Sequence, residues 1–120
     1  MTTRRPDTRL ERRCVYESAA AFIMVQHDRP LTLGDVARHS MTSTRQLQRV
    51  LREQETSFRQ LLLRARMAHA VRLLETETRI GEIARAVGYP EASSFSKVFR
   101  SRYACTPSTW RERRRVAWPS

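Results

Sequence analysis

Apolar residues recur along this chain three or four positions apart, as in helices, and no window alternates strictly enough to predict a strand. The first periodic segment covers residues 8–27 and ends before Pro30, because a residue that precedes proline disfavours the helical conformation. Its expected buried residues are Val15, Ala19, Phe22 and Ile23. The pattern predicts an all-α fold that begins with a long helix.

Six more helices are expected from the capping signals between the apolar segments. Thr32, Ser43, Ser57 and Thr106 stand where a hydroxyl can accept a hydrogen bond from the first turn of a helix, and Pro107 suits the first helical position. Ser43 and Ser57 also have capping-box spacing. The predicted helices cover residues 33–38, 44–53, 58–74, 80–86 and 92–102, and a last one begins at 107 and frays into the basic run 111–115. About seven helices are therefore expected.

An internal repeat organises these helices. The segment LGDVAR at 33–38 matches IGEIAR 47 residues later, and LQRVLR at 47–52 matches FSKVFR 48 residues later. One extra residue must therefore lie between Gly88 and Phe95. Each copy reads as a short helix, a tight turn and a second helix.

Each copy has a small residue, Ala37 or Ala84, at the centre of its first helix. A small side chain lets the second helix cross closely, as in a helix-turn-helix. The repeat predicts two helix-turn-helix subdomains, at residues 1–55 and 76–120, joined by a linker helix at 56–75. The second subdomain includes the basic tail.

The second helix of each copy has one apolar and one polar face. At about 100° per residue, the residues that share the apolar arc are Leu47, Val50 and Leu51 in the first copy and Phe95, Val98 and Phe99 in the second. The opposite arcs carry Arg45, Gln48, Arg49 and Arg52, and Ser93, Ser96, Lys97 and Arg100. Long cationic chains can reach guanine edges or phosphates, and small hydroxyls let the backbone approach a groove floor. Double-stranded DNA is therefore the expected partner.

These faces give a specific set of expected contacts. We expect base reading from Arg45, Gln48, Arg49, Ser93, Ser96 and Lys97, and phosphate contacts from Ser43, Arg52, Ser94 and Arg100. Arg and Gln can form bidentate contacts worth about 1–3 kcal/mol of base discrimination. The first subdomain is therefore expected to contribute more specificity and the second more anchoring.

Composition supports a polyanionic partner and counts against other classes. The net charge is +11 and the isoelectric point is about 11.4, as expected for a nucleic-acid-binding chain. No apolar run approaches the roughly 20 residues that span a bilayer, and no signal peptide is apparent, so a cytoplasmic location without membrane contact is expected. No catalytic constellation or phosphate-binding glycine loop is present, so an enzyme is not expected.

The cysteines do not suggest a metal centre. Cys14 and Cys105 lie far apart and have no CxxC or Cys/His spacing. We expect both to be buried free thiols, with no metal and no cofactor.

A longer motif indicates a family. Its positions are Ile80, Ile83, Ala84, Val87, Gly88 and Tyr89, then residues 94–99, then Tyr103, Thr106, Pro107, Trp110 and Arg111. This pattern resembles the signature of the AraC/XylS family of bacterial transcription regulators, and the resemblance extends over about residues 15–114. It implies seven helices in two subdomains, each inserting a recognition helix into consecutive segments of the major groove. It also implies an activating role through RNA polymerase. We expect the chain to bind DNA as a monomer.

The chain departs from the family pattern in two turns and in length. Met41 and Ala104 stand where the family usually has Gly; in a left-handed conformation Met41 would cost about 1 kcal/mol. With 120 residues there is no room for an effector domain, so the chain resembles the short stand-alone members of the MarA and SoxS type. A DNA-binding fragment of a larger effector-responsive regulator is the alternative.

Other classes of function remain as competing interpretations. A non-specific nucleic-acid-binding protein would share the charge, and a membrane-surface protein would share the basic helices. An alkyl-transfer repair enzyme would need a reactive Cys and metal-holding thiols, which two separated cysteines do not supply.

Overall fold

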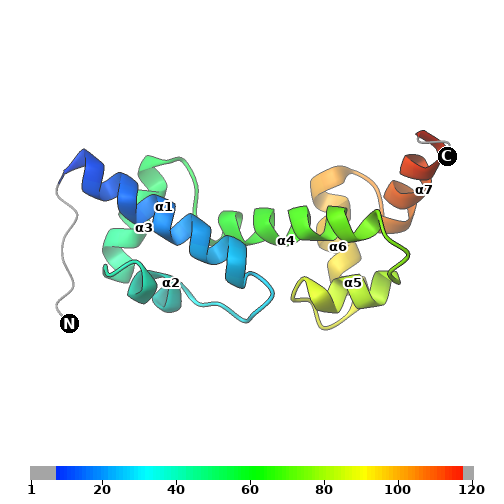
Figure 1. Ribbon diagram of the computed structural model, residues 1–120, viewed down its shortest axis with the longest axis horizontal. Helices are drawn as coiled ribbons and strands as arrows, with labels where there is room; N and C mark the ends of the chain where they lie inside the picture. Colours follow the sequence, from blue (N-terminus) through cyan, green and yellow to red (C-terminus); the bar gives the residue numbers. More distant parts are fainter. Residues whose placement is uncertain (1–7, 118–120) are drawn as a thin grey trace. The chain divides into compact units, whose positions relative to one another are not determined.

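The computed structural model describes residues 8–117, and within that range it contains seven α-helices and no strand (Figure 1). The helices are α1 (Arg9–Gln26), α2 (Leu33–His39), α3 (Thr44–Glu53), α4 (Phe58–Leu74), α5 (Ile80–Ala86), α6 (Ala92–Tyr103) and α7 (Pro107–Ala117). The predicted all-α fold is confirmed. The chain divides within α4, after Ala65, into two compact units, which we call unit 1 and unit 2.

Most helices of unit 1 begin at a hydroxyl cap. The Thr8 hydroxyl accepts a hydrogen bond from the Glu11 amide at 3.0 Å, and the Glu11 carboxylate accepts one from the Thr8 amide at 3.2 Å. The Ser43 hydroxyl accepts the Gln46 amide at 3.1 Å. The expected capping box is only half formed there, because Gln46 Oε1 has no hydrogen-bond partner among the residues that the structure describes.

The core of unit 1 is aliphatic and lies where α1, α2, α3 and the first half of α4 meet. Its buried residues are Ala19, Ile23, Leu31, Val36, Ala37, Leu47, Leu51, Leu61 and Ala65. Two residues expected to be buried, Val15 and Phe22, are only half-buried and pack against this cluster. The Phe22 ring stacks on the His39 ring with centroids 4.1 Å apart, which keeps it at the edge of the core.

The core of unit 2 is built around aromatic rings. Phe95 and Phe99 are fully buried, with ring centroids 5.8 Å apart. Trp110 of α7 meets Phe99 edge-on at 5.9 Å and lies 5.1 Å from the Tyr103 ring. Edge-to-face geometry of this kind is favourable for aromatic pairs. Val98, expected to be buried, is half-buried.

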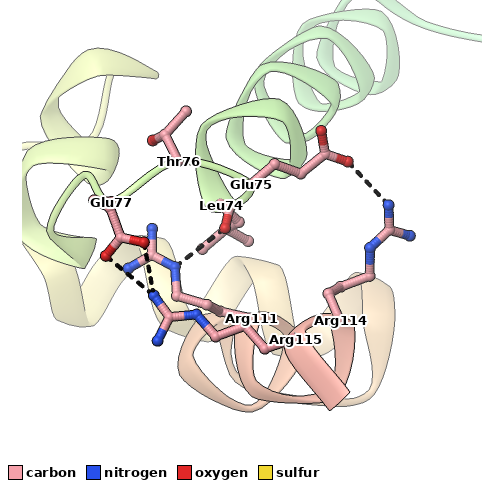
Figure 2. Close-up of a pocket in the computed structure, with 7 residues that line it drawn as sticks. All are labelled: Leu74, Glu75, Thr76, Glu77, Arg111, Arg114 and Arg115. Carbon is pink, nitrogen blue, oxygen red and sulfur yellow. Dashed lines mark hydrogen bonds and ion pairs between the residues drawn. The ribbon is translucent and has the colours of Figure 1, made fainter. Parts of the chain in front are cut away.

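Helix α7 is held to the segment between α4 and α5 by arginines (Figure 2). Arg111 donates from Nε to the Leu74 carbonyl at 3.1 Å and from Nη2 to the Thr78 carbonyl at 2.6 Å. The last carbonyls of a helix have no partner within it, so Arg111 satisfies one of those of α4.

Two ion pairs extend this brace, Arg114 to Glu75 at 2.9 Å and Arg115 to Glu77 at 3.2 Å. The basic run 111–115 is helical. The expectation that it frays into a tail was wrong. Three of its arginines, Arg111, Arg114 and Arg115, have partners 33 to 39 positions earlier in the chain, which a local reading of charge does not reveal.

Candidate nucleic-acid interface

The turn that precedes α3 in unit 1 has the same hydrogen bonds as the turn that precedes α6 in unit 2. In unit 1 the Met41 amide donates to the Arg38 carbonyl at 3.2 Å and the Thr42 amide to the Ala37 carbonyl at 3.0 Å. In unit 2 the residues 47 positions later form the same two bonds, from Gly88 to Arg85 at 3.1 Å and from Tyr89 to Ala84 at 2.8 Å. The repeat seen in the sequence is therefore a repeat of backbone geometry.

The central residue of each turn is left-handed. Met41 has a φ of 57° and Gly88 a φ of 96°. Glycine adopts this region freely, whereas a residue with a Cβ is strained by about 1 kcal/mol or more. Ala104, which ends α6, has a φ of 61° and carries the same penalty. Met41 and Ala104, which stand where the resemblance predicts glycine, are thus both in the left-handed conformation that favours glycine.

The extra residue of the second copy is Pro90. In unit 1 the cap residue Ser43 directly follows Thr42, whereas in unit 2 Pro90 separates Tyr89 from the cap residue Glu91. This position lies inside the interval that the two offsets predict. The insertion comes after the shared turn, so it affects the start of α6 and leaves the turn itself unchanged.

Helix α3 presents a cationic face. Leu47, Val50 and Leu51 are at most 2% exposed and hold the helix to unit 1. The exposed residues on the other side include Ser43, Arg45, Gln48, Arg49 and Arg52. None of these three arginines forms an ion pair with a carboxylate that the structure describes. They are therefore available to an external anion.

Helix α6 presents smaller polar groups. Phe95 and Phe99 anchor it in unit 2. Of the predicted contact residues, Ser93, Ser94, Lys97 and Arg100 are exposed and Ser96 is half-buried. Each unit thus brings its own predicted residues onto one helix, and contact with DNA stays a prediction for all ten.

The start of α6 adds a feature that the sequence reading missed. Its cap residue, Glu91, makes no side-chain hydrogen bond to the helix. The first amides of a helix have no internal partner and carry a partial positive charge. In α6 these amides lie beside the exposed Ser93 and Ser94, where a phosphate could accept from them. A glutamate in place of Ser, Thr, Asp or Asn at the cap was the available signal.

One carboxylate has a clear electrostatic shift. The Asp35 carboxylate accepts a hydrogen bond from the Thr32 amide at 3.0 Å, and its own amide donates to the Thr32 hydroxyl at 3.1 Å. The hydrogen bonds with Thr32, backbone first, lower the pKa of Asp35, and Arg38 and Arg29 add to the effect. Asp35 therefore stays ionised at the start of α2, where a negative charge is favourable.

The described residues contain neither a metal-ligand cluster nor a helix that could span a membrane. Between residues 8 and 117, no three His, Cys, Asp or Glu side chains gather closely enough to hold a metal ion. No described helix is long and apolar enough to cross a membrane. Cys105 is buried, but Cys14 is exposed on α1, so the expectation of two buried thiols was wrong for Cys14. Its neighbours in the helical pattern, Leu10 and Ala21, are exposed as well.

Comparisons with known proteins agree with this architecture. A family model described as a helix-turn-helix domain matches residues 36–113. The HTH-type transcriptional regulator GadX of Escherichia coli O157:H7 is 37% identical over 90 residues, which are 74% of this chain and 33% of GadX. The transcriptional activator NphR of a Rhodococcus species is 31% identical over 87 residues, 72% of this chain and 26% of NphR. The chain thus spans between about a quarter and a third of the length of these curated relatives.

A solved structure matches over nearly the whole length. The crystal structure of a transcriptional regulator from Chromobacterium violaceum, one of the proteins that contain an AraC-type DNA-binding domain, is 27% identical with a TM-score of 0.79. The match covers 88% of this chain and 95% of that chain. Both subdomains are therefore included in the likeness.

Proposed function

Since the chain belongs to the AraC/XylS family of helix-turn-helix transcription regulators, we propose that it reads specific double-stranded DNA through α3 and α6, inserted into adjacent segments of the major groove. Membership of the family makes it a DNA-binding transcription regulator. The two-helix reading is the finer proposal. It rests on this chain's own residues.

The observation that carries the proposal is the repeated turn together with the helix after it. The same pair of backbone hydrogen bonds precedes α3 and α6. Each of these helices buries one face and exposes a polar one. A chain that uses only one helix for DNA would have no need for the same geometry twice. Two similar faces in one chain match two successive groove segments.

The two faces are proposed to do different work. On α3, Arg45, Gln48 and Arg49 are long and exposed and have no side-chain partner within residues 8–117, which suits bidentate contacts with bases. On α6, the hydroxyls and the uncapped amides suit contacts with the DNA backbone, and the longer Lys97 side chain can reach the bases. Unit 1 then contributes most of the sequence discrimination and unit 2 most of the anchoring.

Partners and location depend on the same proposal. One chain carries both reading helices, so we propose that it binds DNA as a monomer. We propose activation through contact with RNA polymerase, which the name of the relative NphR as a transcriptional activator supports. The place of action is then the cytoplasm, on the chromosome. We also propose no enzymatic activity.

A second candidate is that the chain acts as the DNA-binding part of a longer, effector-responsive regulator. The observation in its favour is the length of the relatives, because the matched segment is only 33% of GadX. In both cases the reading surface is the same. The two differ in what controls it.

The test is selection of binding sites from random duplexes at a stated salt concentration, since affinity for DNA falls steeply with salt. We expect Arg49→Ala to relax the preference at one base position, with about 1–3 kcal/mol lost on the preferred base. Arg100→Ala should weaken all sites alike. Arg64→Ala, at an exposed position of α4 with no carboxylate partner among the described residues, is the matched loss of one positive charge.

Two results would overturn the proposal. In one, scrambled competitor DNA displaces the chain as well as the selected site does, which is the behaviour of a non-specific binder. In the other, Arg49→Ala and Arg64→Ala have the same effect, so that α3 supplies charge and no base reading.

A further inference from the structure

A cavity of about 520 Å³ lies in unit 1 between the end of α3 and the start of α4. Its apolar lining comes from Leu33, Leu51 and Phe58, which also pack on the core of unit 1. Arg52 and Arg59 line it as well, and both are exposed. The volume falls within the range of about 300–1,000 Å³ that small-molecule sites have.

The charge of this cavity has no internal counterpart. No Asp or Glu lines it, and neither arginine pairs with a carboxylate among residues 8–117. Ser57 begins α4 and accepts a hydrogen bond from the Gln60 amide at 3.2 Å. The two earlier amides of α4, those of Phe58 and Arg59, have no partner within the helix and carry its positive end. The cavity therefore combines an apolar lining with three sources of positive potential.

In two other cavities, arginines are paired with carboxylates that line the same cavity. In the cavity at α7, Arg114 and Arg115 are paired with Glu75 and Glu77, which line the same cavity (Figure 2). An anion entering it would have to displace a carboxylate already present. The cavity between α3 and α4 has no such competitor.

A second neutralised cavity lies between α1 and α3. Arg12 is paired there with Glu53 at 3.2 Å and Arg13 with Glu17 at 3.0 Å, and all four residues line the cavity. Arg9 of this cavity and Arg111 of the cavity at α7 also have no carboxylate partner among the described residues, so the cavity between α3 and α4 is the one of these three in which no arginine is paired with a carboxylate.

We infer that this cavity binds a small organic monocarboxylate with an aromatic body, whose carboxylate meets Arg59 and Arg52 and whose ring lies on Leu33, Leu51 and Phe58. A bare inorganic anion would leave the apolar lining unused. A neutral aromatic molecule would leave the arginines unused. The charged and the apolar groups together select an amphipathic anion.

Occupancy of the cavity would interfere with DNA. Gln48 and Arg52 line it, and both belong to the α3 face assigned to bases and phosphates. A bound carboxylate would engage Arg52 and restrict Gln48. This part of the inference rests on the proposed function. The bound anion would then act as a negative regulator that competes with the specific DNA site.

The test uses 2-naphthoate as the probe on the DNA-free chain, followed by amide NMR. We expect saturable shifts confined to residues near the cavity, including Leu51, Ser57 and Arg59. The variant Arg59→Gln should weaken binding about tenfold, as expected for loss of a charge-assisted hydrogen bond. Arg64→Gln, an exposed arginine of the same helix that does not line the cavity, should leave the affinity unchanged.

Three outcomes would overturn the inference. Equal binding of the neutral 2-naphthamide would show that the arginines are not used. Equal shifts with inorganic phosphate at matched ionic strength would show a simple anion site, as for a DNA phosphate. No localised shifts up to about 10 mM probe would show that the cavity takes no ligand of this class, since that limit corresponds to less than about 3 kcal/mol of binding.

The competition is measured separately. On the selected DNA site, 2-naphthoate should lower the affinity of the chain, and it should do so about tenfold less effectively for Arg59→Gln. If the chain selects no DNA site at all, the proposed function fails while the titration on the free chain still decides about the cavity. If the probe binds the cavity and DNA affinity does not change, the regulatory part is overturned.

Discussion

The two units share one turn geometry but support it with different chemistry. Unit 1 has a Ser43 cap, an aliphatic core and a left-handed Met41 in its turn. Unit 2 has an uncapped α6, an aromatic core and a Gly88 in the corresponding turn. Different side chains can therefore stabilise the same backbone geometry, and each copy has its own weak point.

The weak point of unit 1 is its turn. The left-handed Met41 is strained, and the neighbouring Ser40 and Thr42 have buried hydroxyl oxygens without a partner within the described part of the chain. In unit 2 the corresponding position after the glycine is Tyr89, whose ring lies 5.4 Å from the Arg66 guanidinium and 6.0 Å from the Phe95 ring. We therefore expect the turn of unit 2 to open less often than that of unit 1.

The largest expected effect is a loss of stability in the core of unit 2 that leaves the core of unit 1 intact. Phe99 is fully buried among the rings of unit 2, so Phe99→Ala should lower the free energy of unfolding of that unit by about 3–5 kcal/mol. Hydrogen exchange measured residue by residue should show loss of protection in α5, α6 and α7. Amides of α1, α2 and α3 should keep theirs.

The control for that change is Ser101→Ala, an exposed position of the same helix, which should have almost no effect. Equal loss of protection in both units would contradict the comparison. It would mean that the chain unfolds as one cooperative body.

A smaller effect is expected from exchanging the residues of the two turns. Met41→Gly should raise the free energy of unfolding of unit 1 by up to about 1 kcal/mol, because glycine removes the strain of the left-handed conformation. Gly88→Ala should lower that of unit 2 by about 1–2 kcal/mol. The added Cβ would also lie 3.0 Å from the Arg66 guanidinium, which must move.

Urea unfolding of both variants measures these changes in the free energy of unfolding. Opposite signs for Met41→Gly and Gly88→Ala support the equivalence of the two turns. If Met41→Gly destabilises unit 1, then the contacts of the Met41 side chain, which is 55% exposed, outweigh its backbone strain.

The smallest expected effect concerns the start of α2, which is capped, compared with the start of α5, which is not. Arg79 precedes α5 without a side-chain cap, whereas Thr32 caps α2 and lowers the pKa of Asp35. Because the pKa of Asp35 is depressed in the folded chain, the ionised carboxylate contributes to the stability of the fold. This contribution is present above the ordinary pKa of 3.8 and is lost as the pH falls through the folded pKa.

The variant Thr32→Ala removes the hydroxyl but keeps the backbone amide, which is the larger cause, so the pKa of Asp35 should move only part of the way up toward its ordinary value. Carboxyl NMR titration measures this, with Arg79→Ala as the control that leaves the pKa of Asp35 unchanged. An unchanged pKa in Thr32→Ala would show that the Thr32 hydroxyl does not contribute to the lowered pKa of Asp35.

Much of the fold could be predicted from the sequence because its signals are local. Hydroxyl caps and Pro107 mark helix starts, and the structure places every predicted helix boundary before α7 within one residue. The burial of Leu47, Leu51, Phe95 and Phe99 follows from helical periodicity alone.

What could not be predicted depends on contacts between distant residues. The helical state of 111–115 rests on ion pairs with Glu75 and Glu77. The exposure of Cys14 depends on which side of α1 meets the core, and one thiol in the pattern does not decide that. The cavity between α3 and α4 required the positions of Leu33 and Phe58 from two different helices.

The most direct test of the central claim compares the sites selected by Arg49→Ala and by Lys97→Ala with the site selected by the original chain. If both helices read bases in adjacent groove segments, each variant relaxes a different block of base positions, and the two blocks lie about 10 base pairs apart. If both variants relax the same positions, or if Lys97→Ala only weakens every site equally, then α6 reads no bases and the two-helix account is contradicted.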